Sequence, residues 1–240
     1  MYALWGTLKA AVPLIVHGNP YLLSIIGFTL QVAAIATGIA TVIGIPIGLV
    51  LGLGRFRGRR VMQVFANASL GLPPVLVGLF LLLLFVPQGP LGSFNLPITR
   101  RAVLIAQTVL ALPYVVALTA AAVQGLPPGL PAQARALGAG RRQLYALALR
   151  EARIGVIAGV IAALGTTLSE VGAIVVVGGN VYGYDQTLAS AALFEANAVH
   201  LTDAVAIGMV LTAMILILVG GVGVLQQWGG GIRMRFRPLT

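Results

Sequence analysis

Five apolar stretches constrain the fold of this chain more than any other feature of its sequence. They cover residues 21–53, 61–86, 102–123, 154–177 and 204–225. Each has at least about the 20 residues that a helix needs to cross the hydrocarbon core of a bilayer. Charged residues make up only 8% of the chain, which is too few to coat a water-facing surface. The sequence therefore predicts an all-α membrane protein with about five transmembrane helices.

The two ends of the chain differ from the apolar stretches between them. Residues 1–20 contain Pro13, Pro20 and a single charge at Lys9, so we expect a short helix that lies in the membrane interface rather than a span. The transmembrane domain is predicted to cover residues 21–227. A basic tail is predicted for residues 228–240.

Small side chains recur every four positions in the first apolar stretch, at Ala40, Gly44, Gly48 and Gly52. Positions four apart lie on one face of a helix. A face of small residues lets two helices approach closely inside a membrane. We predict that this face packs on another helix of the same chain, with a contact between two copies as the alternative.

The arginines are distributed unevenly between the apolar stretches. Twelve of them fall within residues 54–60, 124–153 and 228–240, which five spans would place on one side of the membrane. The opposite side holds only three basic residues. The positive-inside rule assigns the arginine-rich side to the cytoplasm. The chain is thus predicted to be a multi-pass cell-membrane protein with its N-terminus outside and its C-terminus in the cytoplasm.

Several kinds of activity lack the residues that they would require. Lys9 is the only lysine and does not follow a glycine-rich loop, so the chain has no Walker A site for ATP. The chain has no cysteine, and His17 and His200 are isolated in the sequence, so no metal site and no catalytic residue is predicted. The basic residues lie between apolar runs, and we therefore do not expect nucleic acid as a partner.

The loop at residues 126–153 has a pattern of its own. It opens with a glycine- and proline-rich run, which indicates a break in the backbone structure. A short helix is expected before Gly138, a turn at Gly138 and Gly140, and a second helix over residues 143–150. Short helices with apolar and cationic sides suit docking into a groove on a soluble partner. The alternative is an ordinary basic loop that only follows the topology rule.

This loop resembles the loop by which permeases of ABC importers dock on their ATPase, with the pattern Glu-Ala-Ala, three residues, then Gly. Gly138 stands at the glycine and Ala134 at the last alanine, whereas Ala132 replaces the glutamate. The resemblance implies that this cytoplasmic coupling helix contacts the ATPase. The implied contact residues are Ala134, Arg135, Ala136, Leu137, Gly138, Ala139, Arg141, Arg142 and Leu144.

Three further segments resemble molybdate-type permeases, in the order expected for that family. They are the double-proline segment 71–78, the segment 107–115, and the segment 169–180 with its Ser-Glu-Val-Gly-Ala and Gly-Asn motifs. The last of these is most similar to tungstate-specific permeases. The likeness extends over about residues 20–225.

The resemblance implies the fold and the partners of a type I ABC importer permease. Two copies would form a homodimeric pore in membrane lipid, served by two cytoplasmic ATPase subunits and an external oxyanion-binding protein. ATP and magnesium would bind to the ATPase, so this chain would need no cofactor. Tungstate is the favoured substrate, with molybdate or sulfate as alternatives. A channel or secondary transporter that works without ATP is the alternative class, but the five unequal spans show no sign of the inverted repeats common in such transporters.

Residues that could line or gate the pathway lie in the second and fourth spans. Glu170 is costly inside a membrane, and we expect it to bond backbone groups near Gly172 in an unwound stretch. Hydroxyl groups there could face an oxyanion or bond their own helix, and Asn180 could present N–H groups to an anion or end a helix. The candidates are Thr166, Ser169, Glu170, Gly172, Asn180, Pro73 and Pro74.

Overall fold

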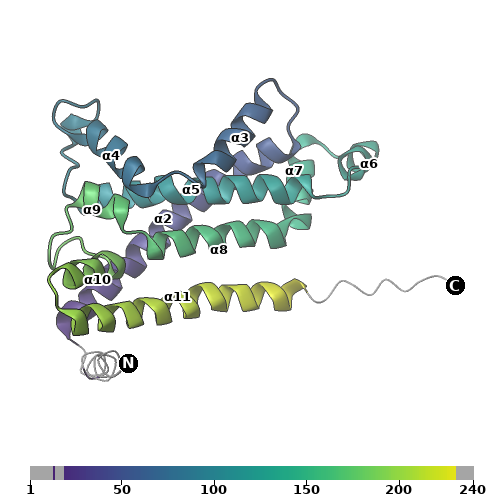
Figure 1. Cartoon of the computed structure of the whole chain (residues 1–240). Helices are drawn as coiled ribbons and strands as arrows, with labels where there is room; N and C mark the ends of the chain where they lie inside the picture. Colours follow the sequence, from purple (N-terminus) through teal and green to yellow (C-terminus); the bar gives the residue numbers. More distant parts are fainter. Residues whose placement is uncertain (1–12, 14–18, 231–240) are drawn as a thin grey trace.

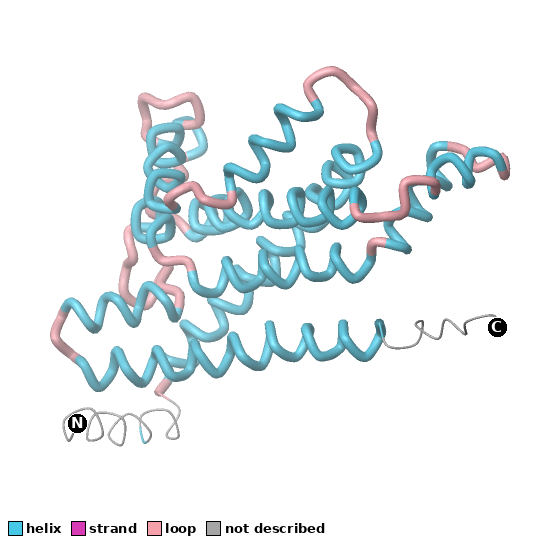
Figure 2. The backbone as a smooth tube through the Cα atoms, turned by 45° about the vertical axis from the view of Figure 1, so that its right-hand side comes forward, coloured by secondary structure: helices cyan, strands magenta, loops and turns pink. Residues whose placement is uncertain are grey.

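The computed structural model describes residue 13 and residues 19–230, and the backbone of this part is helical without strands (Figures 1 and 2). The interfacial helix expected at residues 1–20 lies almost entirely outside the described residues, as does the tail beyond residue 230. The elements are α2 (Pro20–Leu53), α3 (Arg59–Ser69), α4 (Pro74–Phe85), the 3-10 turn η1 (Gly92–Phe94), α5 (Arg100–Gln124), α6 (Leu130–Ala136), α7 (Arg141–Glu151), α8 (Arg153–Ser169), α9 (Gly172–Gly178), α10 (Leu188–Asn197) and α11 (Leu201–Gly230).

Three helices in the described residues are long and apolar enough to cross a membrane by themselves: α2, α5 and the Leu201–Val224 part of α11. Two further spans are counted when each bent helix pair is taken as one, which agrees with the predicted number of five. The pair α3 and α4 bends by 108°, and the pair α8 and α9 bends by 57°. The second and fourth spans are therefore broken, and the break between α8 and α9 lies at the unwound stretch expected near Gly172.

The break between α3 and α4 follows from two consecutive prolines. Pro73 is extended, with φ −62° and ψ 121°, and Pro74 is the first residue of α4. Neither proline has an N–H group to donate, and each disfavours a helical residue before it. A helix can therefore begin at Pro74 but cannot run through it, and Figure 1 shows α3 and α4 leaving α5 as two separate arms.

The most extensive packing between two helices joins α2 to α5. A Cβ atom built on Gly44 would lie 2.8 Å from the Cβ of Val115, and one on Gly48 would lie 2.6 Å from that of Thr119. One turn on, a Cβ on Gly52 would lie 2.6 Å from Val123 Cγ1. Three glycines spaced four residues apart in α2 thus contact three residues with the same spacing in α5. The prediction that the small-residue face packs within the chain is confirmed.

Four of the remaining helices, α3, α4, α8 and α9, also pack on α5. Figure 1 shows α5, α8 and α11 as roughly parallel rods with α2 crossing them, and it places α6 and α7 at one end of the bundle and α10 at the other. On the α8 side, Gly159 lies under Leu118 of α5, where an added Cβ would be 3.1 Å from the leucine Cβ. Helix α11 is less buried and packs on α10 and α8. The two short helices α6 and α7 match the two helices predicted for the loop.

The α2–α5 contact can be tested with one methyl group. We expect Gly48→Ala to lower the free energy of unfolding by about 1–3 kcal/mol, because overpacking of a tight contact costs this much. The control is Gly38→Ala in the same helix, where an added Cβ meets no atom within 4 Å. Thermal unfolding of both variants in detergent measures the difference. Equal melting temperatures of the two variants would contradict this packing.

Candidate functional site

The loop between α5 and α8 is held in shape by its glycines. Helix α6 ends at Ala136 with Leu137 as its C-cap, and Gly138 follows with φ +83°, a left-handed conformation that glycine adopts without strain. The Gly138 N–H donates to the Arg135 carbonyl and the Ala139 N–H to the Ala134 carbonyl, both at 2.9 Å. These are the backbone bonds that close a helix C-terminus. The chain then turns directly into α7.

Helix α7 is anchored to the transmembrane bundle by its apolar side. Ala148 is buried in a cluster with Leu49 of α2, Val123 of α5 and Val156 of α8, and Tyr145 and Leu149 of α7 pack against this cluster. Removal of a leucine side chain from such a cluster costs about 2–5 kcal/mol. The apolar side of α7 therefore contacts three membrane helices at once.

The predicted docking residues fall into two groups. Ala134 and Leu144 are buried and hold the loop together, while Ala139 is half-buried. Leu137 is 89% exposed at the tip of the loop. The remaining predicted residues, Arg135, Ala136, Gly138, Arg141 and Arg142, are exposed. The exposed group combines one large apolar side chain with three cations, which is a surface that another protein can bind.

The break between α8 and α9 is organised by Glu170. Its backbone is extended, with φ −74° and ψ 132°, and its Oε1 accepts hydrogen bonds from the N–H groups of Val171 at 3.1 Å and Gly172 at 3.0 Å. The carboxylate thus caps the first backbone donors of α9, which lack partners within the helix. This is the backbone-bonded position that the sequence analysis expects for Glu170. Its part in transport stays a prediction.

The two broken spans meet next to their breaks. A Cβ atom on Gly172 would lie 2.5 Å from Val75 Cγ2, and Val75 directly follows the double proline. One turn further on, a Cβ on Gly78 would lie 2.8 Å from the Cα of Ala173. The structure thus brings the start of α4 against the start of α9. The gate candidates at Glu170 and Gly172 come to lie beside the Pro73–Pro74 segment.

Two candidate pore hydroxyls are bonded to their own helix. Thr166 Oγ1 donates to the Ala162 carbonyl at 3.0 Å, and Ser169 Oγ donates to the Gly165 carbonyl at 2.8 Å. Such bonds satisfy the hydroxyl donors locally. In this state the structure favours the local alternative for both residues over contact with an oxyanion.

Asn180 lies in the turn that ends α9. It has φ +54° and follows Gly179, which has φ +83°, so both residues reverse the chain. The Asn180 Nδ2 group donates to the Ser190 carbonyl at 3.4 Å. This geometry corresponds to the helix-ending alternative rather than to an anion-binding N–H group.

A carboxylate near this turn was not singled out from the sequence. Asp185 is fully buried, and its Oδ1 accepts a hydrogen bond from the Val181 N–H. Burial raises the pKa of Asp185 above its usual range, and this hydrogen bond and the charge of Arg100 partly offset the effect. The spacing of four residues between Val181 and Asp185 could have suggested that the Asp185 side chain bonds the Val181 N–H. The burial of Asp185, however, depends on helices that are distant in sequence.

Residues treated as isolated in the sequence also come together at the α10–α11 corner. His200 Nδ1 lies 2.9 Å from Glu195 Oε2. One ligand atom each from Glu195, His200 and Asp203 lies within 4.8 Å of the others. The turn between two helices brings these side chains together, and the expectation that His200 is isolated is wrong. The three groups could hold a divalent cation, and the Glu195–His200 pair already ties the corner without one.

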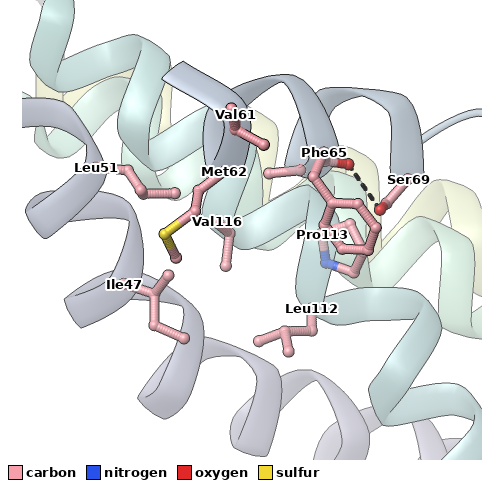
Figure 3. Close-up of a pocket in the computed structure, with 10 residues that line it drawn as sticks. Ile47, Leu51, Val61, Met62, Phe65, Ser69, Leu112, Pro113 and Val116 are labelled. Carbon is pink, nitrogen blue, oxygen red and sulfur yellow. Dashed lines mark hydrogen bonds between the residues drawn. The ribbon is translucent and has the colours of Figure 1, made fainter. Parts of the chain in front are cut away.

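The apolar hollow between α2, α3 and α5 does not suit an anion (Figure 3). It has a volume of about 360 Å³ and is lined by Met62 and Phe65 of α3, by Leu51 of α2 and by Pro113 of α5, with other apolar residues. The Ser69 hydroxyl is its one polar side-chain group, and it donates to the Phe65 carbonyl. A hydrated oxyanion would lose its water there without gaining hydrogen bonds.

These features together define a class of protein: a helical membrane protein with an exposed basic loop and two interrupted spans. Residues 44–227 match the family described as binding-protein-dependent transport system inner membrane component, and the chain belongs to this family. The resemblance to ABC importer permeases is thereby confirmed.

Relatives and solved structures agree with this assignment. The chain is 36% identical to a probable anion ABC transporter permease protein of Haloferax volcanii over 201 residues, which cover 82% of this chain and 87% of the relative. It is 30% identical to the tungstate uptake system permease protein of Peptoclostridium acidaminophilum, with 85% and 89% covered. In fold it is similar to an inward-facing MetNI methionine ABC transporter chain, with a TM-score of 0.64, 19% identity, and 88% and 96% covered.

The capping role of Glu170 can be separated from its charge. We expect Glu170→Ala to lower the free energy of unfolding by about 1–3 kcal/mol, because two backbone donors lose their acceptor. Glu170→Gln keeps an oxygen at the same place. Its free energy of unfolding should therefore fall by less than half as much as that of Glu170→Ala. Thermal unfolding in detergent compares the two variants. An equal loss in both would mean that the charge, and not the hydrogen-bond geometry, stabilises the break.

Proposed function

We propose that this chain is the membrane-spanning subunit of an ATP-driven importer for a tetrahedral oxyanion, with tungstate as the first candidate and molybdate or sulfate as alternatives. The name of the tungstate permease at 30% identity and that of the anion permease at 36% support this substrate class. Two copies would form the pore, an external binding protein would deliver the anion, and two ATPase subunits would bind ATP and magnesium. The chain itself would carry no ATP site.

The observation that carries the proposal is the continuous connection from the exposed loop to the broken span. Ala152 is both the C-cap of α7 and the N-cap of α8, so a single residue separates the two helices. Helix α8 runs 17 residues, or roughly 25 Å, from there to Glu170. A displacement of Leu137 and its arginine neighbours by an ATPase would be carried along α8 to the hinge at Glu170–Gly172.

This connection suggests how the pore is switched. When the ATPase pair closes, the two docking loops of the dimer would move together. The motion would reach the α8–α9 hinge, and α9 would move with α4 because Gly78 and Ala173 are in tight contact. The docking loop would face the cytoplasm, with the C-terminus on the same side and the N-terminus outside, as the arginine distribution predicts.

Reconstitution tests the proposal directly. The chain is placed in liposomes with a candidate ATPase and a binding protein, and tungstate uptake and ATP hydrolysis are measured together. ATP-dependent accumulation stimulated by the loaded binding protein would support the proposal. Tungstate flux that needs no ATPase would instead support a channel or a secondary transporter.

The exposed leucine at the loop tip provides a separate test. We expect Leu137→Asp to reduce ATPase copurification at least about tenfold, because a fully exposed apolar anchor becomes a charge that must be desolvated. The melting temperature of the isolated permease should not change. The control is Leu201→Asp, which is 57% exposed at the first residue of α11, where a carboxylate suits the helix N-terminus. Equal ATPase retention in both variants would contradict docking at Leu137.

The hinge residue should affect coupling rather than assembly. In Glu170→Gln the hydrogen bonds to Val171 and Gly172 lose their charge, which weakens them by about 1 kcal/mol. We expect the complex to assemble normally and its ATPase activity without loaded binding protein to change by about fivefold. Normal transport together with normal coupling in this variant would contradict a gating role for Glu170.

A further inference from the structure

Three arginines from separate segments line one hollow beside the docking loop. Arg55 follows the end of α2, Arg135 belongs to α6 and Arg141 begins α7. The hollow has a volume of about 350 Å³. Residues 55 and 141 are 86 positions apart in the sequence, so this convergence is produced by the fold alone.

The arginine hollow has no internal counter-charge. The chain has five acidic residues, and none of them lines the hollow. The acid nearest in sequence, Glu151, lies at the far end of α7, roughly 15 Å along the helix from Arg141. Among the described residues, the guanidinium groups of these three arginines form neither a hydrogen bond nor an ion pair. Three positive charges around one hollow repel one another unless an anion from outside the chain neutralises them.

The backbone around the hollow also favours an anion. The C-terminal carbonyls of α2 would repel one, but Arg59 covers them by donating from Nε to the Leu51 carbonyl and from Nη2 to the Gly52 carbonyl, at 2.6 and 2.9 Å. Helix α7 starts at Arg141, so the positive end of its dipole lies at the edge of the hollow. The cations and the N-terminus of α7 therefore favour an anion, and the carbonyls of Leu51 and Gly52 are occupied by Arg59.

We propose that the arginine hollow binds a phosphate-type tetrahedral oxyanion group, supplied either by an anionic phospholipid or by a free oxyanion in solution. Guanidinium groups bind such anions through paired, charge-assisted hydrogen bonds. Val50, Leu53 and Phe56 form an apolar wall beside the arginines, which would accommodate the stem of a lipid. This site does not rest on the proposed function, because it requires neither transport nor an ATPase.

The test compares wild type with Arg55→Gln and with a matched control, Arg57→Gln. Both substitutions remove one exposed arginine from the same loop, but Arg57 does not line the hollow. One arm measures retention of phosphatidylglycerol over phosphatidylcholine by native mass spectrometry of the purified permease. The other arm measures binding of tungstate and of inorganic phosphate by equilibrium dialysis. We expect Arg55→Gln to weaken binding about tenfold or more and Arg57→Gln to change it less than twofold.

The pattern of results identifies the source of the anion. Selective loss in the lipid arm assigns the hollow to a phospholipid headgroup, and selective loss in the dialysis arm assigns it to a free oxyanion. Arg141→Gln serves as the second variant if Arg55→Gln does not fold, and it should show the same loss. The proposal is overturned if wild type binds none of these probes, or if Arg55→Gln and Arg57→Gln weaken binding equally. It is also overturned if Arg55→Gln reduces ATPase copurification and leaves the binding of all these probes unchanged. The hollow would then be part of the surface that contacts the ATPase.

Discussion

The contact between α2 and α5 supports the rest of the bundle. Lipid tails are as apolar as leucine, so helices in a bilayer gain little from hydrophobic burial and depend on close packing instead. Gly44, Gly48 and Gly52 let the backbone of α2 approach the side chains of α5. Helices α3, α4, α8 and α9 then pack on other sides of α5. Loosening this one interface would displace both broken spans and the anchor of the docking loop.

The breaks in the second and fourth spans are stable because their backbone groups find partners. An unpaired N–H group at membrane depth costs several kcal/mol, and irregular backbone is therefore tolerated only inside protein or along a cavity. Glu170 accepts the first two donors of α9, and two prolines at the start of α4 have no donors to satisfy. The start of α4 also packs against the start of α9, so the two breaks lie side by side.

The spans and the loop helices could be predicted from local sequence. The features that could not be predicted share one cause. The number of spans and the two loop helices follow from apolar length and from glycine and proline positions, and the structure contains them. Helix α10 was missed because its ten residues are too short for a span, and it is held by packing on α11 and α2. The pairing of Glu195 with His200, and the burial of Asp185, depend on turns whose geometry is set by distant helices.

The residues alone predict three properties: how many times the chain can cross a bilayer, which loops share a side, and which loop offers a surface to a partner. The bilayer imposes them segment by segment, through the length of each apolar run and the charge beside it. Only the tertiary structure decided that α4 meets α9 next to both breaks, and that three arginines surround one hollow. These are contacts between segments far apart in sequence, and they depend on which helix faces pack together, which no single segment specifies.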